Sequence, residues 1–170
     1  MALGCISQNH FVYSLKAQKC LDVVIPRFTR SYGPTMFMTD TKAVSQFIKK
    51  GISGEDIVLK SIGTQFYSYT YVADAVSGLL FVLLQGENGE AYNIADEASD
   101  IMLKDLAEVI AQVTGSKVAF EIPDKVEAAG YSKATKARLN GQKLKTLGWK
   151  PKYNIHTGLR KTINILGEIK

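Results

Sequence analysis

The hydrophobic positions of this chain fall into short blocks, and their spacing alternates between the period of a strand and that of a helix. Residues 21–25 (LDVVI) form a compact, β-branched run closed by Pro26, which predicts a buried strand of a parallel sheet followed by a loop. Three further short strands are predicted at residues 56–60 (DIVLK), 91–96 (AYNIAD) and 117–123 (KVAFEIP).

A separate extended segment, residues 65–72 (QFYSYTYV), carries Tyr67, Tyr69 and Tyr71 at alternate positions. Because successive side chains of a strand point to opposite faces, one face of this segment is predicted to be lined by phenols. The segment leads directly into residues 72–84 (VADAVSGLLFVLL), which are apolar on most sides of a helix. That helix is therefore predicted to be buried between layers.

Helical spacing recurs in several other segments, and Ser99 and Asp100 stand where they could cap one of these helices. Because helices and strands alternate throughout, the pattern predicts an α/β arrangement in which helices cover a small sheet. The remaining predicted helices are residues 41–50, residues 103–113, a short helix before residues 147–151, and a final helix that aligns Leu159, Ile163 and Leu166.

A length of 170 residues predicts one domain, and 46% hydrophobic with 22% charged residues is the balance of an ordinary soluble protein. The net charge of +5 does not come from a basic run, because lysines and arginines are scattered among acids. A phosphate-bearing small molecule therefore fits as well as a nucleic acid, for which the sequence holds no recognition motif. We expect no nucleic-acid partner.

Cys5 and Cys20 have neither metal-ligand nor redox spacing, and the sequence contains only two histidines. Reduced thiols in a cytoplasmic protein, with no metal site, are the favoured interpretation. The most apolar run, residues 78–84, is far too short to cross a membrane, so we expect no membrane partner.

Five strings follow one another in a fixed order: RFTRSYGPTM (27–36), GEDIVLKSIGTQFYSYTYVADAVSGLL (54–80), GEAYNIAD (89–96), LKDLAEVI (103–110) and LGWKPKYNIHTGLRKTI (147–163). This order resembles the C-terminal half of extended short-chain dehydrogenase/reductases, the NAD-dependent epimerases, dehydratases and decarboxylases of nucleotide sugars. FMTDTKAVSQFI (37–48) is most similar to the UDP-glucuronate decarboxylase and dTDP-glucose 4,6-dehydratase branches.

The resemblance implies a fold class and a division of the chain. Residues 21–170 would be the last strand of a Rossmann-type parallel sheet followed by a small α/β substrate-binding lid, whereas residues 1–20 look like an ill-matched leader. A strand at residues 21–25 that lacks most of its sheet would offer an open edge. We therefore expect a homodimer or another form of self-association, unless the leader covers that edge.

The resemblance also implies site residues. The turn after the first strand would lie at the carboxyl edge of the sheet, where Thr29 and Ser31 would face the nicotinamide of NAD and Arg30 the sugar. The family commonly has Asn where Arg30 stands, which puts that contact in doubt. Lys42 matches a basic position near the nucleotide diphosphate, although a solvated lysine explains it equally well.

Two further positions concern the diphosphate. Many relatives carry Arg where this chain has Tyr67, which has no charge and is either a weaker substrate contact or a packed core residue. Arg138 matches a second family arginine, and its five-donor fork could replace what Tyr67 lacks. Asp74, Asn93 and Trp149 belong to the same motifs and are interpreted as structural.

Catalysis in the family requires a Gly-rich turn for NAD and a Tyr followed four positions later by Lys. This sequence contains neither feature, so we assign no catalytic residue and expect that the chain alone does not bind NAD. The predicted function is the substrate-binding portion of an NAD-dependent nucleotide-sugar enzyme, inactive alone. The alternative is a non-catalytic module that binds UDP- or dTDP-sugars.

Overall fold

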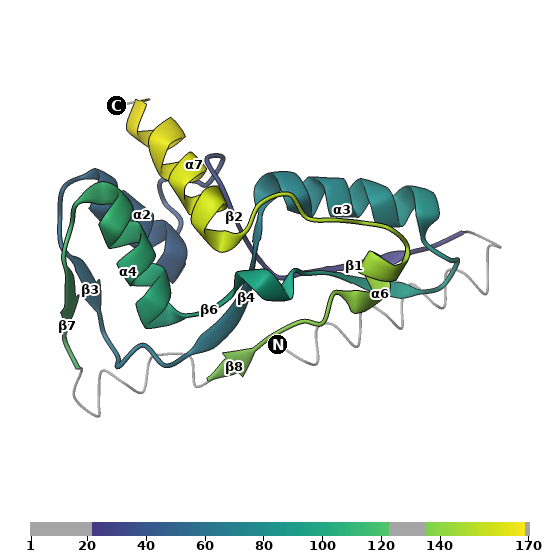
Figure 1. Cartoon of the computed structure of the whole chain (residues 1–170), viewed down its shortest axis with the longest axis horizontal. Coiled ribbons are helices and arrows are strands. Elements are labelled where there is room, and N and C mark those ends of the chain that lie inside the picture. The colour runs from purple at the N-terminus through teal and green to yellow at the C-terminus, as the bar shows by residue number, and fades with distance from the viewer. Residues whose placement is uncertain (1–21, 123–134, 169–170) are drawn as a thin grey trace.

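The computed structural model describes residues 22–122 and 135–168, so the predicted leader, residues 1–20, lies outside the described residues (Figure 1). In chain order its elements are β1 (Ile25–Phe28), β2 (Arg30–Tyr32), α2 (Ala43–Ile52), β3 (Ile57–Leu59), β4 (Phe66–Tyr71), α3 (Val72–Gln85), β5 (Ala91–Ile94), the 3₁₀ turn η1 (Glu97–Ser99), β6 (Asp100–Met102), α4 (Leu103–Thr114), β7 (Val118–Phe120), β8 (Lys136–Ala137), α6 (Gln142–Thr146) and α7 (Ile155–Glu168). This alternation confirms the predicted α/β class.

Most of the strand pairing is parallel, and β4 lies at its centre. Strand β4 pairs with β6 in antiparallel fashion along one edge, and its other edge is shared by β8 and then β2, both parallel to it. Two smaller parallel pairs, β1 with β5 and β3 with β7, flank this sheet on opposite sides (Figure 1).

The larger hydrophobic core is formed by helices α2, α4 and α7, which pack against one another, and by β3 and β4, of which β4 packs against α7. The three alternating tyrosines of β4 are all buried in it, which confirms the predicted phenol-lined face. Their neighbours include Leu106 of α4 and Leu159 of α7, both fully buried. A smaller core joins α3 to β5 and α6 through Val82, Tyr92, Ile94, Leu144 and Trp149.

The first strand differs from the prediction. It spans Ile25–Phe28 and includes Pro26, whereas residues 22–24 lie outside it and Leu21 is outside the described residues. The N–H of Ile25 donates to the carbonyl of Glu90 beside β5, so the next position points away from β5. Proline is tolerated there because it removes a donor only from the edge that has no partner strand among the described residues.

Helix α3 is not buried between layers as its composition predicted. One face, with Asp74, Ala75, Gly78 and Val82, packs against β1 and β5. The opposite face exposes five large apolar side chains, and Leu83 and Leu84 are 65% and 74% exposed. The described residues provide only one layer for a helix that is apolar on two faces. The other three of these five exposed apolar side chains are those of Val76, Leu79 and Leu80.

The predicted capping of α4 by Ser99 or Asp100 is wrong. The N-cap position is Met102, which makes no side-chain cap hydrogen bond, because Ser99 ends η1 and Asp100 begins β6. The end of α4 follows expectation, since Gly115 adopts the left-handed conformation (φ 75°) that glycine tolerates without strain.

The residues interpreted as structural have structural partners. Buried Asp74 accepts hydrogen bonds from the backbone N–H groups of Lys152 (2.9 Å) and Tyr153 (2.8 Å), which ties α3 to the segment before α7. The Asn93 amide donates to the Asn140 carbonyl at 2.8 Å. No helix within residues 22–122 and 135–168 is long and apolar enough to span a membrane.

Candidate functional site

The edge of β4 has a gap where several predicted site residues meet. Along this edge β8 ends with Ala137 opposite Tyr67, and β2 begins with Arg30 opposite Tyr69. Along β4, only Ser68 separates the residues paired with β8 from those paired with β2. We call this place the β4 gap and define it by Thr29, Arg30, Tyr67, Ser68, Asp100 and Arg138.

Arg30 occupies the tyrosine face of the β4 gap. Its guanidinium carbon lies 3.7 Å from the centroid of the Tyr67 ring, a cation–π contact. The side chain is half-buried, and the ion pairs among the described residues do not include it. Burial raises the pKa of neighbouring Tyr69 to about 12, although the positive charge of Arg30 lowers it. A neutral phenol leaves the charge of Arg30 uncompensated.

Arg138 lies at the same gap on the other face of the sheet. Strand alternation places Phe66 and Ser68 on that face, and the Arg138 guanidinium carbon is 5.1 Å from the Phe66 ring centroid. Its Nε donates to a carboxylate oxygen of Asp100 at 2.6 Å. The side chain of Arg138 is 47% exposed whereas that of Asp100 is 3% exposed, so the arginine faces solvent from a buried anchor.

Thr29 and Ser31 line the approach to this face. The Thr29 hydroxyl shares a 2.6 Å hydrogen bond with that of Thr70 on β4, and Ser31 is exposed. The turn that follows is compact: a Cβ on Gly33 would lie 2.4 Å from Cγ1 of Val72, at the start of α3. Glycine is therefore required where the turn passes under α3.

Lys42 is not brought into the β4 gap. It is the N-cap residue of α2, its side chain is 67% exposed, and its ammonium pairs with Asp40 at 3.5 Å. The backbone N–H of Lys42 also donates to Asp40, and this hydrogen bond is the main cause that lowers the pKa of the Asp40 carboxyl.

Ser68 and Asp100 are site residues that the sequence did not identify. The Ser68 hydroxyl lies 2.6 Å from Asp100, and it accepts from the backbone N–H of Leu139 at 3.0 Å. Both side chains are buried, and through their hydrogen bonds this pair anchors the Arg138–Leu139 segment to β4. One signal was available, since Ser68 is a polar residue between two of the alternating tyrosines and therefore lies on the opposite face of the strand.

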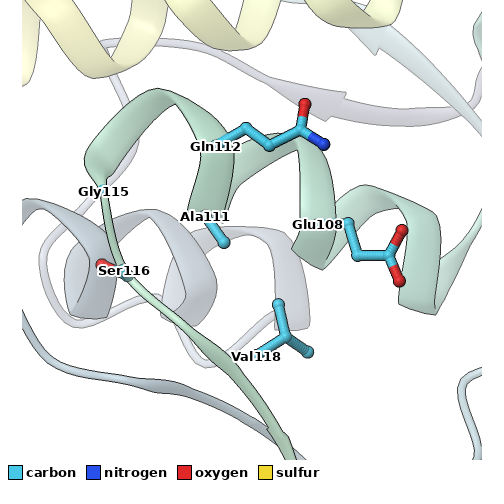
Figure 2. A pocket seen from close by; sticks show the side chains of 6 residues that line it. All are labelled: Glu108, Ala111, Gln112, Gly115, Ser116 and Val118. Atoms are coloured by element: carbon cyan, nitrogen blue, oxygen red, sulfur yellow. The ribbon is translucent and has the colours of Figure 1, made fainter.

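Two cavities of the described residues lie away from the β4 gap. One, of about 440 Å³, lies beside the C-terminal half of α4 (Figure 2). Its charged lining residue is Glu108, and its lining includes no lysine or arginine. A second, of about 350 Å³, lies between α4 and α7. Within the described ranges, His, Cys, Asp and Glu side chains form no group of three that could hold a metal ion. The lining of the second cavity includes His156 and Arg160, whereas the β4 gap brings together the guanidinium groups of Arg30 and Arg138. We take the β4 gap as the candidate site for an anionic ligand because it has two arginines.

Comparison with curated proteins gives several relatives. UDP-glucuronic acid decarboxylase 1 of Xenopus tropicalis is 30% identical over 152 residues, which are 89% of this chain and 35% of that protein. dTDP-D-glucose 4,6-dehydratase of Mus musculus is 30% identical over 156 residues, or 90% of this chain and 43% of that protein. The chain thus spans less than half the length of these two relatives.

Solved structures share the fold. The UDP-glucose 4-epimerase of Thermotoga maritima, solved with UDP-glucose, superposes with a TM-score of 0.84 at 23% identity, covering 96% of this chain and 52% of that one. The dTDP-glucose 4,6-dehydratase of Bacillus anthracis, solved with NAD, gives a TM-score of 0.79 at 21% identity, covering 94% of this chain and 49% of that one.

A family model confirms the resemblance inferred from the motifs. The model described as the NAD dependent epimerase/dehydratase family matches residues 6–95. The match begins inside the stretch set apart above as a leader, so a boundary at residue 20 stays a prediction. The matched region, the ordered motifs and the shared fold lead to one conclusion: this chain belongs to the NAD-dependent epimerase/dehydratase family.

Proposed function

We propose that this chain is the substrate-binding portion of an NAD-dependent nucleotide-sugar epimerase, dehydratase or decarboxylase, and that the β4 gap holds the diphosphate of a UDP- or dTDP-sugar. The observation that carries the proposal is the placement of Arg30 and Arg138 at opposite faces of the same one-residue gap in the edge of β4. A diphosphate between sugar and nucleoside is the anion that two such guanidinium groups suit.

The stacking of Arg30 on Tyr67 accounts for the departure from the family pattern. Where many relatives carry Arg, this chain has Tyr67, and where relatives commonly carry Asn, it has Arg30. Because the Arg30 guanidinium lies over the Tyr67 ring, the positive charge is kept near the position of the missing arginine. The two departures compensate each other in charge, which supports a retained anion site.

The relatives support the substrate class. Proteins similar to this chain are named as UDP-glucuronic acid decarboxylases and a dTDP-D-glucose 4,6-dehydratase, and a structural neighbour was solved with UDP-glucose. The chain shares its fold with enzymes whose substrates carry a nucleoside diphosphate.

The described residues fit only one end of a dinucleotide. The hydroxyl groups of Thr29 and Ser31 could face a nicotinamide, but that of Thr29 is already bonded to Thr70. The sequence has no Gly-rich turn for the NAD pyrophosphate. The residues present therefore do not fit the whole cofactor. A module that binds nucleotide sugars without chemistry uses the same residues, and the absence of a Tyr-x-x-x-Lys motif favours it as the alternative.

Calorimetric titration with UDP tests the proposal. Wild-type chain is expected to bind UDP weakly, in the millimolar range or better. Arg30→Ala and Arg138→Ala should each weaken binding by about 1.5–3 kcal/mol, the scale of a charge-assisted hydrogen bond. Lys42→Ala should weaken it less, because Lys42 is exposed and paired with Asp40. Equal effects of all three substitutions would indicate general charge attraction instead of a site.

A further inference from the structure

We infer that Asp100 is a positioning residue for the substrate anion: its buried carboxylate fixes the Arg138 guanidinium so that its remaining N–H groups are presented at the β4 gap. This inference rests on the proposed function, and it adds a residue whose role the family motifs do not assign. Asp100 would act on the ligand through Arg138 and not by contact.

The geometry is that of a clamp on one end of the guanidinium. An arginine carries five N–H donors, and Asp100 takes the one on Nε, at 2.6 Å. The Phe66 ring, whose centroid lies 5.1 Å from the guanidinium carbon, is a second contact of the same group. The outer amino groups of Arg138 make no hydrogen bond to another residue within 22–122 and 135–168. They are free for a phosphate.

The carboxylate is itself held in place. Ser68 lies 2.6 Å from one Asp100 oxygen, and Arg138 binds the other. The Ser68 hydroxyl also accepts from the N–H of Leu139, so both the side chain of Arg138 and the backbone beside it are tied to β4. An arginine side chain that is already ordered loses less conformational entropy on binding than a free one.

Substitution of Asp100 should change the affinity for UDP in opposite directions according to whether Asp100 acts only by its charge or by positioning Arg138. Removing a carboxylate near an anion site reduces repulsion, so charge alone predicts that Asp100→Asn and Asp100→Ala bind UDP more tightly. If Asp100 instead positions Arg138, both variants should bind UDP more weakly than wild type. Asparagine keeps one acceptor oxygen for Arg138 and alanine keeps none, so binding should weaken modestly for Asp100→Asn and by about tenfold for Asp100→Ala.

The experiment is a calorimetric titration with UDP of wild type, Asp100→Asn, Asp100→Ala, Arg138→Ala and the Asp100→Ala/Arg138→Ala double variant. Asp56→Asn is the control of matched charge, because Asp56 lies beside β3 and accepts from the Lys117 N–H. In the double variant, loss of Asp100 should cost no further affinity, since the residue it positions is gone. Thermal unfolding of each variant separates binding from folding, and if Asp100→Ala does not fold, Asp100→Asn carries the comparison.

A second readout needs no ligand. In the NMR spectrum of wild type, the Nε–H group of Arg138 should be ordered, and it should become mobile in Asp100→Ala. Tighter UDP binding by either Asp100 variant, or an equal loss with and without Arg138, would overturn the positioning role while leaving the proposed function intact. Failure of wild type to bind UDP would overturn both.

Discussion

A single stacked pair sets the electrostatics at one face of the β4 gap. The guanidinium carbon of Arg30 lies over the Tyr67 ring, and Tyr67 is buried in the main core, so the ring is held in place while the cation remains half-buried. A guanidinium on an aromatic face gains about 0.5–2 kcal/mol and keeps its N–H groups in the plane free for hydrogen bonds. Tyr67 therefore orders a cation and need not contact the ligand itself.

Substitutions at Tyr67 separate the ring from the hydroxyl. Tyr67→Phe keeps the aromatic face and should leave UDP affinity within about twofold of wild type. Tyr67→Leu keeps an apolar core residue but removes the stack, so Arg30 loses its platform and UDP affinity should fall by about 0.5–1 kcal/mol. Calorimetry measures both. A larger loss for Tyr67→Phe than for Tyr67→Leu would assign the role to the hydroxyl.

The sequence predicted Arg30, Tyr67 and Arg138 one by one as site residues, but it could not show which of them lie side by side. The stack of Arg30 on Tyr67 depends on the register of two strands that are 37 positions apart, and a hydrophobic pattern does not specify cross-strand register at that distance. Asp100 was misread because an acid before a helix is a usual cap. The short strand β6 intervenes and turns its side chain toward Ser68.

Helix α3 exposes more large apolar side chains than any other element of the described residues. Leu80, Leu83 and Leu84 form an apolar stripe along one side of a helix whose opposite side is already packed. Strand β1, which pairs only with β5 within residues 22–122 and 135–168, lies beside α3 (Figure 1). Apolar surface of this kind usually marks a contact with another chain or domain. We propose that the isolated chain self-associates through this face, and self-association through residues 21–25 stays a prediction.

Replacing part of the stripe tests this proposal. Leu80→Gln/Leu83→Gln should raise the monomer fraction in analytical ultracentrifugation, because it removes apolar area without touching the packed face of α3. Ile62→Gln is the control, since Ile62 is 61% exposed but lies in the loop before β4. A wild-type chain that is monomeric at high concentration, or an equal effect of the control, would contradict the proposal.

Helix α6 depends on a cluster of charges that titrates. Partial burial alone would raise the pKa of Glu97, but hydrogen bonds from the Lys145 ammonium and the Gly141 N–H outweigh it and hold the pKa below its usual value. Between the native and the usual pKa of Glu97, the unfolded chain therefore binds more protons than the native chain. The contribution of Glu97 to the free energy of unfolding is complete above the usual pKa and is lost as the pH falls through the native pKa. The hydrogen bond between Lys145 of α6 and Glu97 of η1 attaches these two elements to each other.

Urea unfolding of wild type and Glu97→Gln at several pH values measures this contribution. Wild type should be the more stable protein at neutral pH, and the difference should shrink as the solution is acidified from about pH 6 to about pH 3. A difference that grows on acidification would show that Glu97 is not stabilised in its charged form in the native state.

Element types were predictable, whereas their surroundings were not. The helix at 103–113 and the tyrosine strand carry strong periodicity and occur almost where the pattern placed them. The exposure of α3 could not be predicted, because an apolar composition indicates that a helix needs partners and does not say whether the partners are present. The inclusion of Pro26 in β1 likewise depended on which edge is paired.

At the scale of the whole molecule, the chain combines a family fold with an incomplete set of family chemistry. It spans 35% and 43% of two relatives' lengths and contains no Tyr-x-x-x-Lys pair. We expect the chain alone to reduce no NAD with UDP-glucose, UDP-glucuronate or dTDP-glucose above a boiled control. Heat-sensitive NADH formation, followed by absorbance, would show that another residue serves as the base.

The central claim is that the β4 gap binds a nucleotide sugar, and a titration of isotope-labelled chain with UDP-glucose, followed by NMR, tests it most directly. The largest amide shifts are predicted at Thr29, Arg30, Arg138 and Leu139, and they should saturate together because one ligand causes them. Shifts concentrated around Glu108 and Ser116, at the cavity beside α4, or no saturable shift at all, would contradict the account.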